Sequence, residues 1–167
     1  MADQNPRSDA DWDRRERNET PTERLDRNWA DLLQELRVAQ TGVQLLTGLL
    51  LTVPFQQRFG ELTEFQRAVY LAALALSVVA TALLIAPVVT HRALFRRHAR
   101  GPLVAAGQRL ALAGLSALGL SVTGVVVLIF DVVAGTTAAV AGGVGTLVLF
   151  GLLWVALPLW QRHRSGD

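Results

Sequence analysis

The residues best suited to chemistry are polar side chains at the start of the first long apolar segment and within it. They are Arg37, Gln40, Thr41, Gln44 and Thr47, followed by Gly48. Intervals of three and four residues place them along one face of a helix. Amides and hydroxyls in such a segment must find partners inside a bundle or a wet cavity. We therefore expect this face to hydrogen-bond between helices, to line a ligand or ion path at Gln40 and Gln44, or to contact a partner protein.

Other chemistry-bearing patterns are absent from the sequence. The chain has no cysteine, which excludes disulfides and thiolate sites. Three histidines, His91, His98 and His163, lack metal-ligand spacing, and no phosphate loop, nucleophile elbow or pair of catalytic carboxylates occurs. Asp131 is the nearest candidate for an ionisable residue within the membrane. It lies at the outer end of the third run, which favours an interfacial helix terminus over an ion ligand. The sequence predicts a protein that is not an enzyme and has no cofactor or metal.

The elements that position the polar face are four apolar runs. Hydrophobic residues make up 51% of the chain and charged residues 18%. The runs cover residues 38–55, 68–89, 110–130 and 137–160, and none contains a charged residue or histidine. Each is close to the ~20 residues that cross a ~30 Å hydrocarbon core as a helix. The predicted fold is all-α, a bundle of four transmembrane helices over residues 38–160.

Arginine placement predicts the orientation of the bundle. All 16 basic residues are arginine, and only Arg58 and Arg67 lie between the first two runs or between the last two. Short basic segments stay in the cytoplasm, so both termini are predicted to be cytoplasmic, in a bacterial inner (plasma) membrane. Arginine without lysine is typical of a GC-rich bacterial genome. The arginines also explain the high pI, so nucleic acid is not an expected partner.

The N-terminal part divides into two predicted segments. Residues 1–20 contain too few apolar side chains to fold and are expected to form a disordered cytoplasmic tail. Thr20, Pro21 and Glu23 then form a helix-start pattern. We predict an amphipathic helix over 21–37, with Leu25, Trp29 and Leu36 on its apolar face. It lies at the cytoplasmic interface, or it packs on a partner or on its own bundle. Residues 161–167 form a second cytoplasmic tail.

Two further sets of residues have candidate roles. Small side chains recur every four residues on the third and fourth runs, and such residues let membrane helices approach closely. They are Ala113, Ala117 and Ser121 on the third and Gly135, Ala139 and Gly143 on the fourth, which predicts that these helices pack together, within one chain or between subunits. Arginines in the loop between the second and third runs are topology determinants or, alternatively, a site for anionic lipid headgroups. They are Arg92, Arg96, Arg97 and Arg100.

A family resemblance rests on two stretches. NWADLLQELRVAQTGVQLLTGLLLTVPFQQRF, followed by LIAPVVTHRALFRR, resembles a family of small four-helix actinobacterial integral membrane proteins classed as a domain of unknown function. The likeness covers about residues 28–160 and is specific in its first half. Automatic annotation sometimes labels members sodium:proton antiporters, which is the only activity the resemblance implies.

The functional expectation is an accessory or scaffold protein that acts through helix–helix contacts. Its expected partners are membrane lipids and another membrane protein or a second copy of itself. A small sodium or proton transporter or channel is the alternative, with its path lined by Gln40, Gln44 and Thr47. A sensor of membrane state is a third hypothesis, based on the amphipathic segment.

Overall fold

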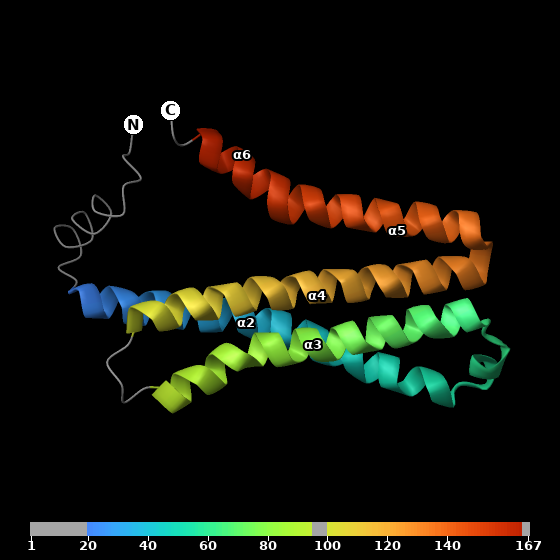
Figure 1. Ribbon diagram of the computed structural model, residues 1–167, viewed down its shortest axis with the longest axis horizontal. Helices are drawn as coiled ribbons and strands as arrows, with labels where there is room; N and C mark the ends of the chain where they lie inside the picture. Colours follow the sequence, from blue (N-terminus) through green and yellow to red (C-terminus); the bar gives the residue numbers. More distant parts are fainter. Residues whose placement is uncertain (1–19, 95–99, 165–167) are drawn as a thin grey trace.

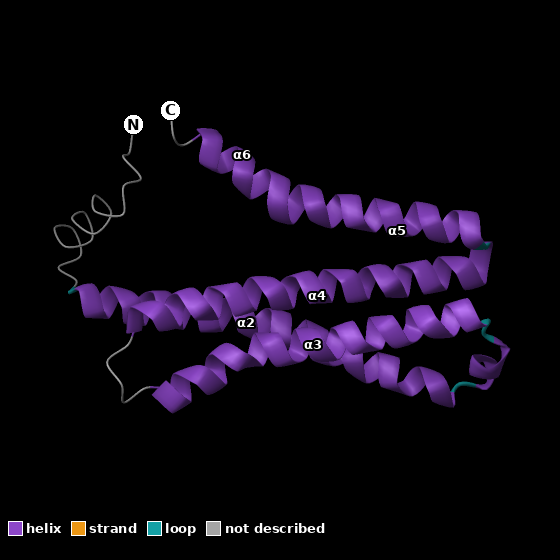
Figure 2. Cartoon of the chain, viewed as in Figure 1, coloured by secondary structure: helices purple, strands orange, loops and turns teal. Residues whose placement is uncertain are grey.

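The protein is built from long helices joined by short turns (Figure 2). The computed structural model describes residues 20–94 and 100–164, and no strand occurs in these ranges. Four of its helical segments are long and apolar enough to cross a membrane. They cover Arg27–Phe55, Glu64–Val89, Ala106–Ala134 and Thr136–Gln161. The predicted all-α fold with four spans is therefore confirmed, and each predicted run lies within one of these segments.

The first helix, α2, runs without interruption from Pro21 to Thr52. Its start has the predicted capping box: the Thr20 N–H donates to Glu23 Oε2 at 2.8 Å, and the Glu23 N–H donates to Thr20 Oγ1 at 3.3 Å. The predicted division at residue 37 is absent, because no glycine or proline lies between residues 22 and 41 to break the helix. The amphipathic segment is thus the first part of the first membrane helix rather than a separate element.

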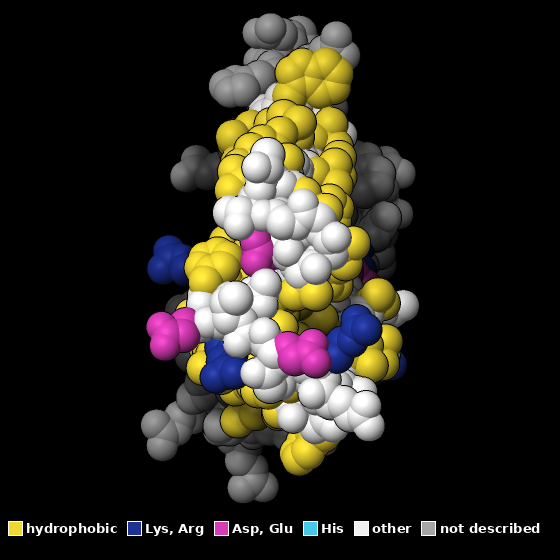
Figure 3. Space-filling model, turned by 90° about the vertical axis from the view of Figure 1, so that its right-hand side faces the viewer, with side chains coloured by type: hydrophobic (Ala, Val, Ile, Leu, Met, Phe, Trp, Pro, Cys, Tyr) yellow, Lys and Arg dark blue, Asp and Glu magenta, His cyan; other side chains and the backbone are white. Residues whose placement is uncertain are grey.

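Two 3-10 turns, η1 (Val53–Phe55) and η2 (Gln57–Glu61), connect α2 to α3 (Glu64–Leu94). The α2 and α3 ends are held together beside this connection. The Tyr70 hydroxyl donates to the Leu50 carbonyl at 2.9 Å, and the Tyr70 ring packs edge-on against Phe59 with 5.3 Å between centroids. Figure 3 shows this end of the molecule, where acidic and basic side chains lie near the turns.

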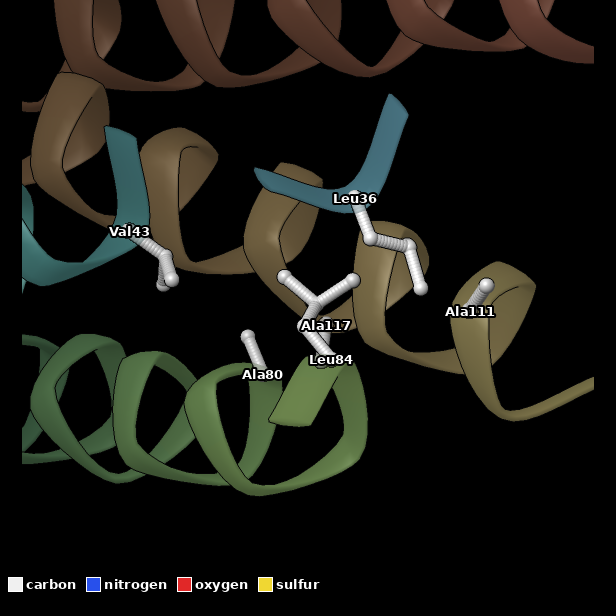
Figure 4. Close-up of a cluster of buried hydrophobic side chains, with 6 residues drawn as sticks. All are labelled: Leu36, Val43, Ala80, Leu84, Ala111 and Ala117. Carbon is white, nitrogen blue, oxygen red and sulfur yellow. The ribbon is translucent and has the colours of Figure 1, made fainter. Parts of the chain in front are cut away.

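Helix α4 (Arg100–Ala134) lies between α3 on one side and α5 on the other, while α2 crosses against α3 and α4 (Figure 1). The most extensive contact joins α3 and α4. A cluster of buried apolar side chains fills the space between α2, α3 and α4 (Figure 4). It consists of Leu36, Val43, Ala80, Leu84, Ala111 and Ala117. These three helices form the packed body of the protein.

Close approach of α3 and α4 depends on small residues of α4. A Cβ atom added at Gly114 would lie 2.8 Å from Leu84 Cγ. Two turns further along α4, the Ser121 hydroxyl donates to the Ala73 carbonyl at 2.7 Å, and Ser121 is fully buried. Van der Waals contact and interhelical hydrogen bonds stabilise membrane helix pairs, because lipid offers no hydrophobic drive between them.

A single residue, Gly135, connects α4 to α5 (Thr136–Gly151). Its φ of 83° lies in the left-handed region that favours glycine. Its N–H donates to the Asp131 carbonyl at 3.0 Å, and its own carbonyl accepts from the Ala139 N–H at 3.1 Å. The gap between the third and fourth predicted runs, residues 131–136, therefore contains one residue outside the helices, because α4 continues to Ala134 and α5 begins at Thr136.

The last membrane helix has three parts. After α5 come a π-helical turn, η3 (Leu152–Ala156), and then α6 (Leu157–Arg164). Figure 1 shows the start of α5 beside the end of α4, and α6 directed away from the other helices. Only 6% of the most apolar stretch of this segment is buried, against 28% for that of Glu64–Val89. Most of its surface is apolar and available to lipid.

Candidate functional site

The inner face of α2 follows a seven-residue repeat. It contains buried and partly buried residues in steps of three and four: Trp29, Leu32, Leu36, Ala39, Val43, Leu46 and Leu50. Every seventh one, from Trp29 through Leu36 and Val43 to Leu50, is buried, with at most 6% of its surface exposed. Such a repeat keeps one side of a helix against its neighbours over its whole length. Since it crosses residue 37, it also explains why the amphipathic segment packs on the bundle.

The opposite side of α2 has polar and small residues that point away from the bundle. Arg37, Thr41, Gln44 and Gly48 are all exposed, and we call these four residues the outer stripe. The Thr41 hydroxyl donates to the Arg37 carbonyl of its own helix at 3.0 Å. Gln44 has no hydrogen bond to any described residue. Its amide is therefore exposed and unpaired within a membrane-spanning segment.

Gln40 and Thr47 lie between the outer stripe and the inner face of α2. Gln40 Nε2 donates to the Leu84 carbonyl of α3 at 2.8 Å, and the Thr47 hydroxyl donates to the Val43 carbonyl at 2.7 Å. Pro87, which is buried, lies within α3 one turn further on. Because proline has no N–H and crowds the preceding turn, the α3 hydrogen-bond ladder is weakened there, and Gln40 supplies a donor beside the weak point.

The predicted polar face of the first span is therefore divided between two surroundings. Gln40 is engaged with α3, whereas Gln44 faces outward. The two amides do not line one path within a single chain. This arrangement was not predictable from their spacing, since residues four apart share a side of the helix but can lie on either edge of a contact.

The third and fourth spans, α4 and α5, pack together within the chain as predicted, but the small residues of α4 do not form that contact. On α4, Ala113 is exposed, Ala117 belongs to the core with α2 and α3, and Ser121 bonds to α3. The reason is that α4 lies between two helices and uses different faces for each. The α3 contact takes the row with Ala117 and Ser121.

The α5 row does pack on α4, but against larger side chains. Ala139 is buried, with 2% of its surface exposed. A Cβ atom added at Gly143 would lie 2.6 Å from Val127 Cγ2 of α4. Further along, Gly119 of α4 makes room for Trp154 of η3, with 3.2 Å from an added Cβ to the ring. Gly135, the remaining member of the predicted row, is the turn residue.

A polar link that the sequence did not reveal joins the start of α3 to the end of α4. Gln66 closes a capping box with Thr63, whose N–H donates to Gln66 Oε1 at 3.0 Å. The Gln66 amide also donates from Nε2 to Asp131 Oδ2 at 2.9 Å. Asp131 Oδ1 is buried and accepts no hydrogen bond from the described residues. The capping box is visible in the sequence, but the link spans 65 positions and leaves no local signal.

In the described part of the chain, we find no recognisable reactive centre among the remaining grooves and charged groups. An apolar groove of about 250 Å³ lies between α4 and α5, and its lining includes Val127, Ala139 and Val144. Among the described residues, no group of three or more histidine, cysteine, aspartate or glutamate side chains is placed to hold a metal ion. Of the predicted headgroup arginines, Arg96 and Arg97 lie outside the described residues. Arg92 and Arg100 lie at the helix ends facing that gap, with side chains outside the described part, so the headgroup site stays a prediction.

The fold defines the class: this is a multi-pass membrane protein with four apolar helices. The chain belongs to a family of unknown function, DUF6328, whose family model matches residues 18–158. The matched region includes all of α2, α3, α4 and α5, so the resemblance expected from the sequence to an uncharacterised family is confirmed. No curated protein and no solved structure matches the chain.

Proposed function

We propose that this protein is a non-enzymatic accessory or scaffold component of the membrane that acts through helix–helix contacts. The observation that supports this function is the outer stripe of α2. Gln44 presents an unpaired amide to the surroundings of the bundle. Lipid tails offer no hydrogen-bond partner, whereas another helix does.

The energetics favour a protein contact at this surface. Interhelical hydrogen bonds in membranes contribute about 0.6 kcal/mol on average and ~1–2 kcal/mol in model peptides. Gly48 adds space for close approach, since a Cβ atom built there would have no neighbour within 4 Å. The outward surface of α5, in contrast, exposes Val144 and Val148, which lipid solvates well. The outer stripe thus gains more from a protein partner than this surface of α5 does.

The test is affinity purification of the full chain from membranes in mild detergent. We expect the wild-type protein to retain a stoichiometric membrane partner or to form a defined homo-oligomer, and Gln44→Leu to weaken that association. Leu49→Ala, on an exposed apolar face of the same helix, is the matched control and should leave it unchanged. A wild-type protein that is a well-behaved lone monomer in membranes and detergent contradicts the proposal.

Sodium or proton transport is the competing function. A path lined by the polar face of α2 requires Gln40 and Gln44 to share one cavity, and their different surroundings in a single chain favour the contact function instead. We expect reconstituted vesicles to show no flux under a sodium or pH gradient. A flux that Gln44→Leu reduces would support transport and contradict the accessory function.

We also propose a bacterial inner-membrane location with both termini in the cytoplasm. The start of α2, the end of α3, the start of α4 and the end of α6 lie at one end of the molecule (Figure 1). In the sequence, 14 of the 16 arginines lie before the first span, between the second and third, or after the fourth. Positively charged segments are retained on the cytoplasmic side. The location is tested by labelling a cysteine introduced near either terminus with an impermeant reagent, which should react only after the cells are opened.

A further inference from the structure

We infer that the partner of the outer stripe is a second copy of this chain, held in a parallel α2–α2 contact with Gln44 opposite Gln44. This inference rests on the proposed function and names its partner. It is carried by three features of α2: the repeat of the outer stripe, the self-complementary chemistry of its central residue, and the orientation that the membrane imposes.

The outer stripe is part of a longer repeat that has the same seven-residue period as the inner face of α2. Its exposed residues alternate in steps of four and three: Ala30, Gln34, Arg37, Thr41, Gln44, Gly48 and Leu51. A row with this spacing fits a neighbouring helix that has the same spacing, because both then supercoil at the same rate. Other described helices also have exposed rows at this spacing, but the α2 row presents the unpaired Gln44 amide within a span. A second α2 matches this row both in spacing, along more than 20 residues, and in its central polar group.

The membrane fixes how two such helices meet. Copies inserted in the same orientation present α2 in the same direction, so a two-fold axis along the membrane normal places each residue near its own counterpart. A glutamine side chain contains both a donor and an acceptor. Each Gln44 amide can therefore donate to the carbonyl oxygen of the other, and both unpaired groups are satisfied by one contact.

The neighbours of Gln44 suit this arrangement. Gly48, one turn further, has open space around it, and Thr41 already uses its hydroxyl on its own helix and so presents a compact side chain. No charge lies in the row between Thr41 and Leu51. The two Arg37 side chains repel each other, but they lie near the arginine-rich end, where long side chains extend to the membrane surface.

Cysteine cross-linking tests the contact directly, because the chain has no cysteine of its own. Single substitutions Thr41→Cys, Gln44→Cys and Gly48→Cys place a thiol in the outer stripe. Val38→Cys, Leu45→Cys and Leu49→Cys place it on the exposed apolar face beside the stripe. Disulfides form only when the two Cα atoms come within about 7 Å. Mild oxidation in native membranes should give a band of twice the 18.1 kDa monomer mass for the stripe variants but not for the controls.

A second measurement uses no introduced thiol. Energy transfer between labelled copies in vesicles should report association of the wild-type chain, and Gln44→Leu should weaken it roughly 3- to 30-fold, the range for loss of an interhelical hydrogen bond. Leu49→Ala should leave the association unchanged.

Each result separates the inference from the function on which it rests. Equal cross-linking at positions 38, 45 and 49 overturns the α2–α2 contact. Cross-linking of stripe cysteines to a different protein, with no homodimer, overturns the second-copy inference and leaves the accessory function standing. A chain that neither cross-links nor associates with any protein in membranes overturns both.

Discussion

Replacement of Gly114 by alanine tests whether α3 and α4 are held at the distance the structure gives. The new Cβ atom would lie 2.8 Å from Leu84 Cγ, 2.9 Å from Leu84 Cδ2 and 3.3 Å from Leu83 Cβ. Ordinary contact begins at 3.4 Å. Leu84 is fully buried in the central cluster, and Cγ is its branch point, so a rotation of the side-chain end does not relieve the clash. Relief requires a different χ1 rotamer of Leu84 inside the packed cluster or a separation of the α3 and α4 backbones, and either one disturbs the packing.

The magnitude follows from a comparison with a second glycine. Overpacking a well-packed core costs about 1–3 kcal/mol, while replacing a helix-interior glycine by alanine gains ~1 kcal/mol in helix propensity. Gly145 of α5 has no atom within 4 Å of an added Cβ, so Gly145→Ala has the propensity gain without the clash. The gain cancels between the two variants, and Gly114→Ala should be less stable than Gly145→Ala by about 1–3 kcal/mol.

The assay is reversible unfolding in mixed micelles, followed by helical circular dichroism as the fraction of denaturing detergent increases. Association must be held constant, which a fixed ratio of protein to detergent provides. Equal free energies of unfolding for Gly114→Ala and Gly145→Ala would refute the close approach of α3 and α4 at Leu84.

Three further predictions concern single groups. Gln40→Leu removes the interhelical hydrogen bond to the Leu84 carbonyl, so the free energy of unfolding should fall by about 0.5–1.5 kcal/mol; a neutral result in the same assay argues against this hydrogen bond. Gly135→Ala forces a left-handed backbone on alanine and should cost roughly 1–2 kcal/mol, whereas an unchanged unfolding curve would mean that the turn has a different conformation. The hydrogen bonds from Thr20 lower the pKa of Glu23, so its contribution to the helix start is complete above the ordinary glutamate pKa and is lost as the pH falls through the lowered value. NMR titration of the Thr20 amide in micelles should show a midpoint below that of an ordinary glutamate, and Glu23→Gln should abolish the titration.

The membrane helices were predictable because their signal is local. Four runs without a single charge leave no other arrangement for so much apolar surface, and the start of α2 at Thr20 was visible as a capping box. The boundary at residue 37 was wrongly placed, since hydropathy changes there while nothing interrupts the backbone. The seven-residue repeat from Trp29 through Leu36 and Val43 crosses that position, and it was the available signal that α2 is one helix.

The candidate site was predictable only in part, because spacing defines a helix face without its neighbour. The small-residue row with Ala117 and Ser121 faces α3 rather than α5. Gln40, predicted on the same polar face as Gln44, instead donates a hydrogen bond to the Leu84 carbonyl of α3. Contacts between residues far apart in the chain, such as that of Gln66 with Asp131, depend on how the helices are arranged as a whole.

The one-residue turn at Gly135 also has a consequence for biogenesis. Only one residue separates the two membrane helices, so we expect α4 and α5 to enter the bilayer together as a hairpin. One inserted residue at this point would rotate α5 by about 100° about its axis and turn Ala139 and Gly143 away from α4. The backbone geometry of Gly135 therefore sets the direction and rotation of α5, a helix that buries little of its own surface.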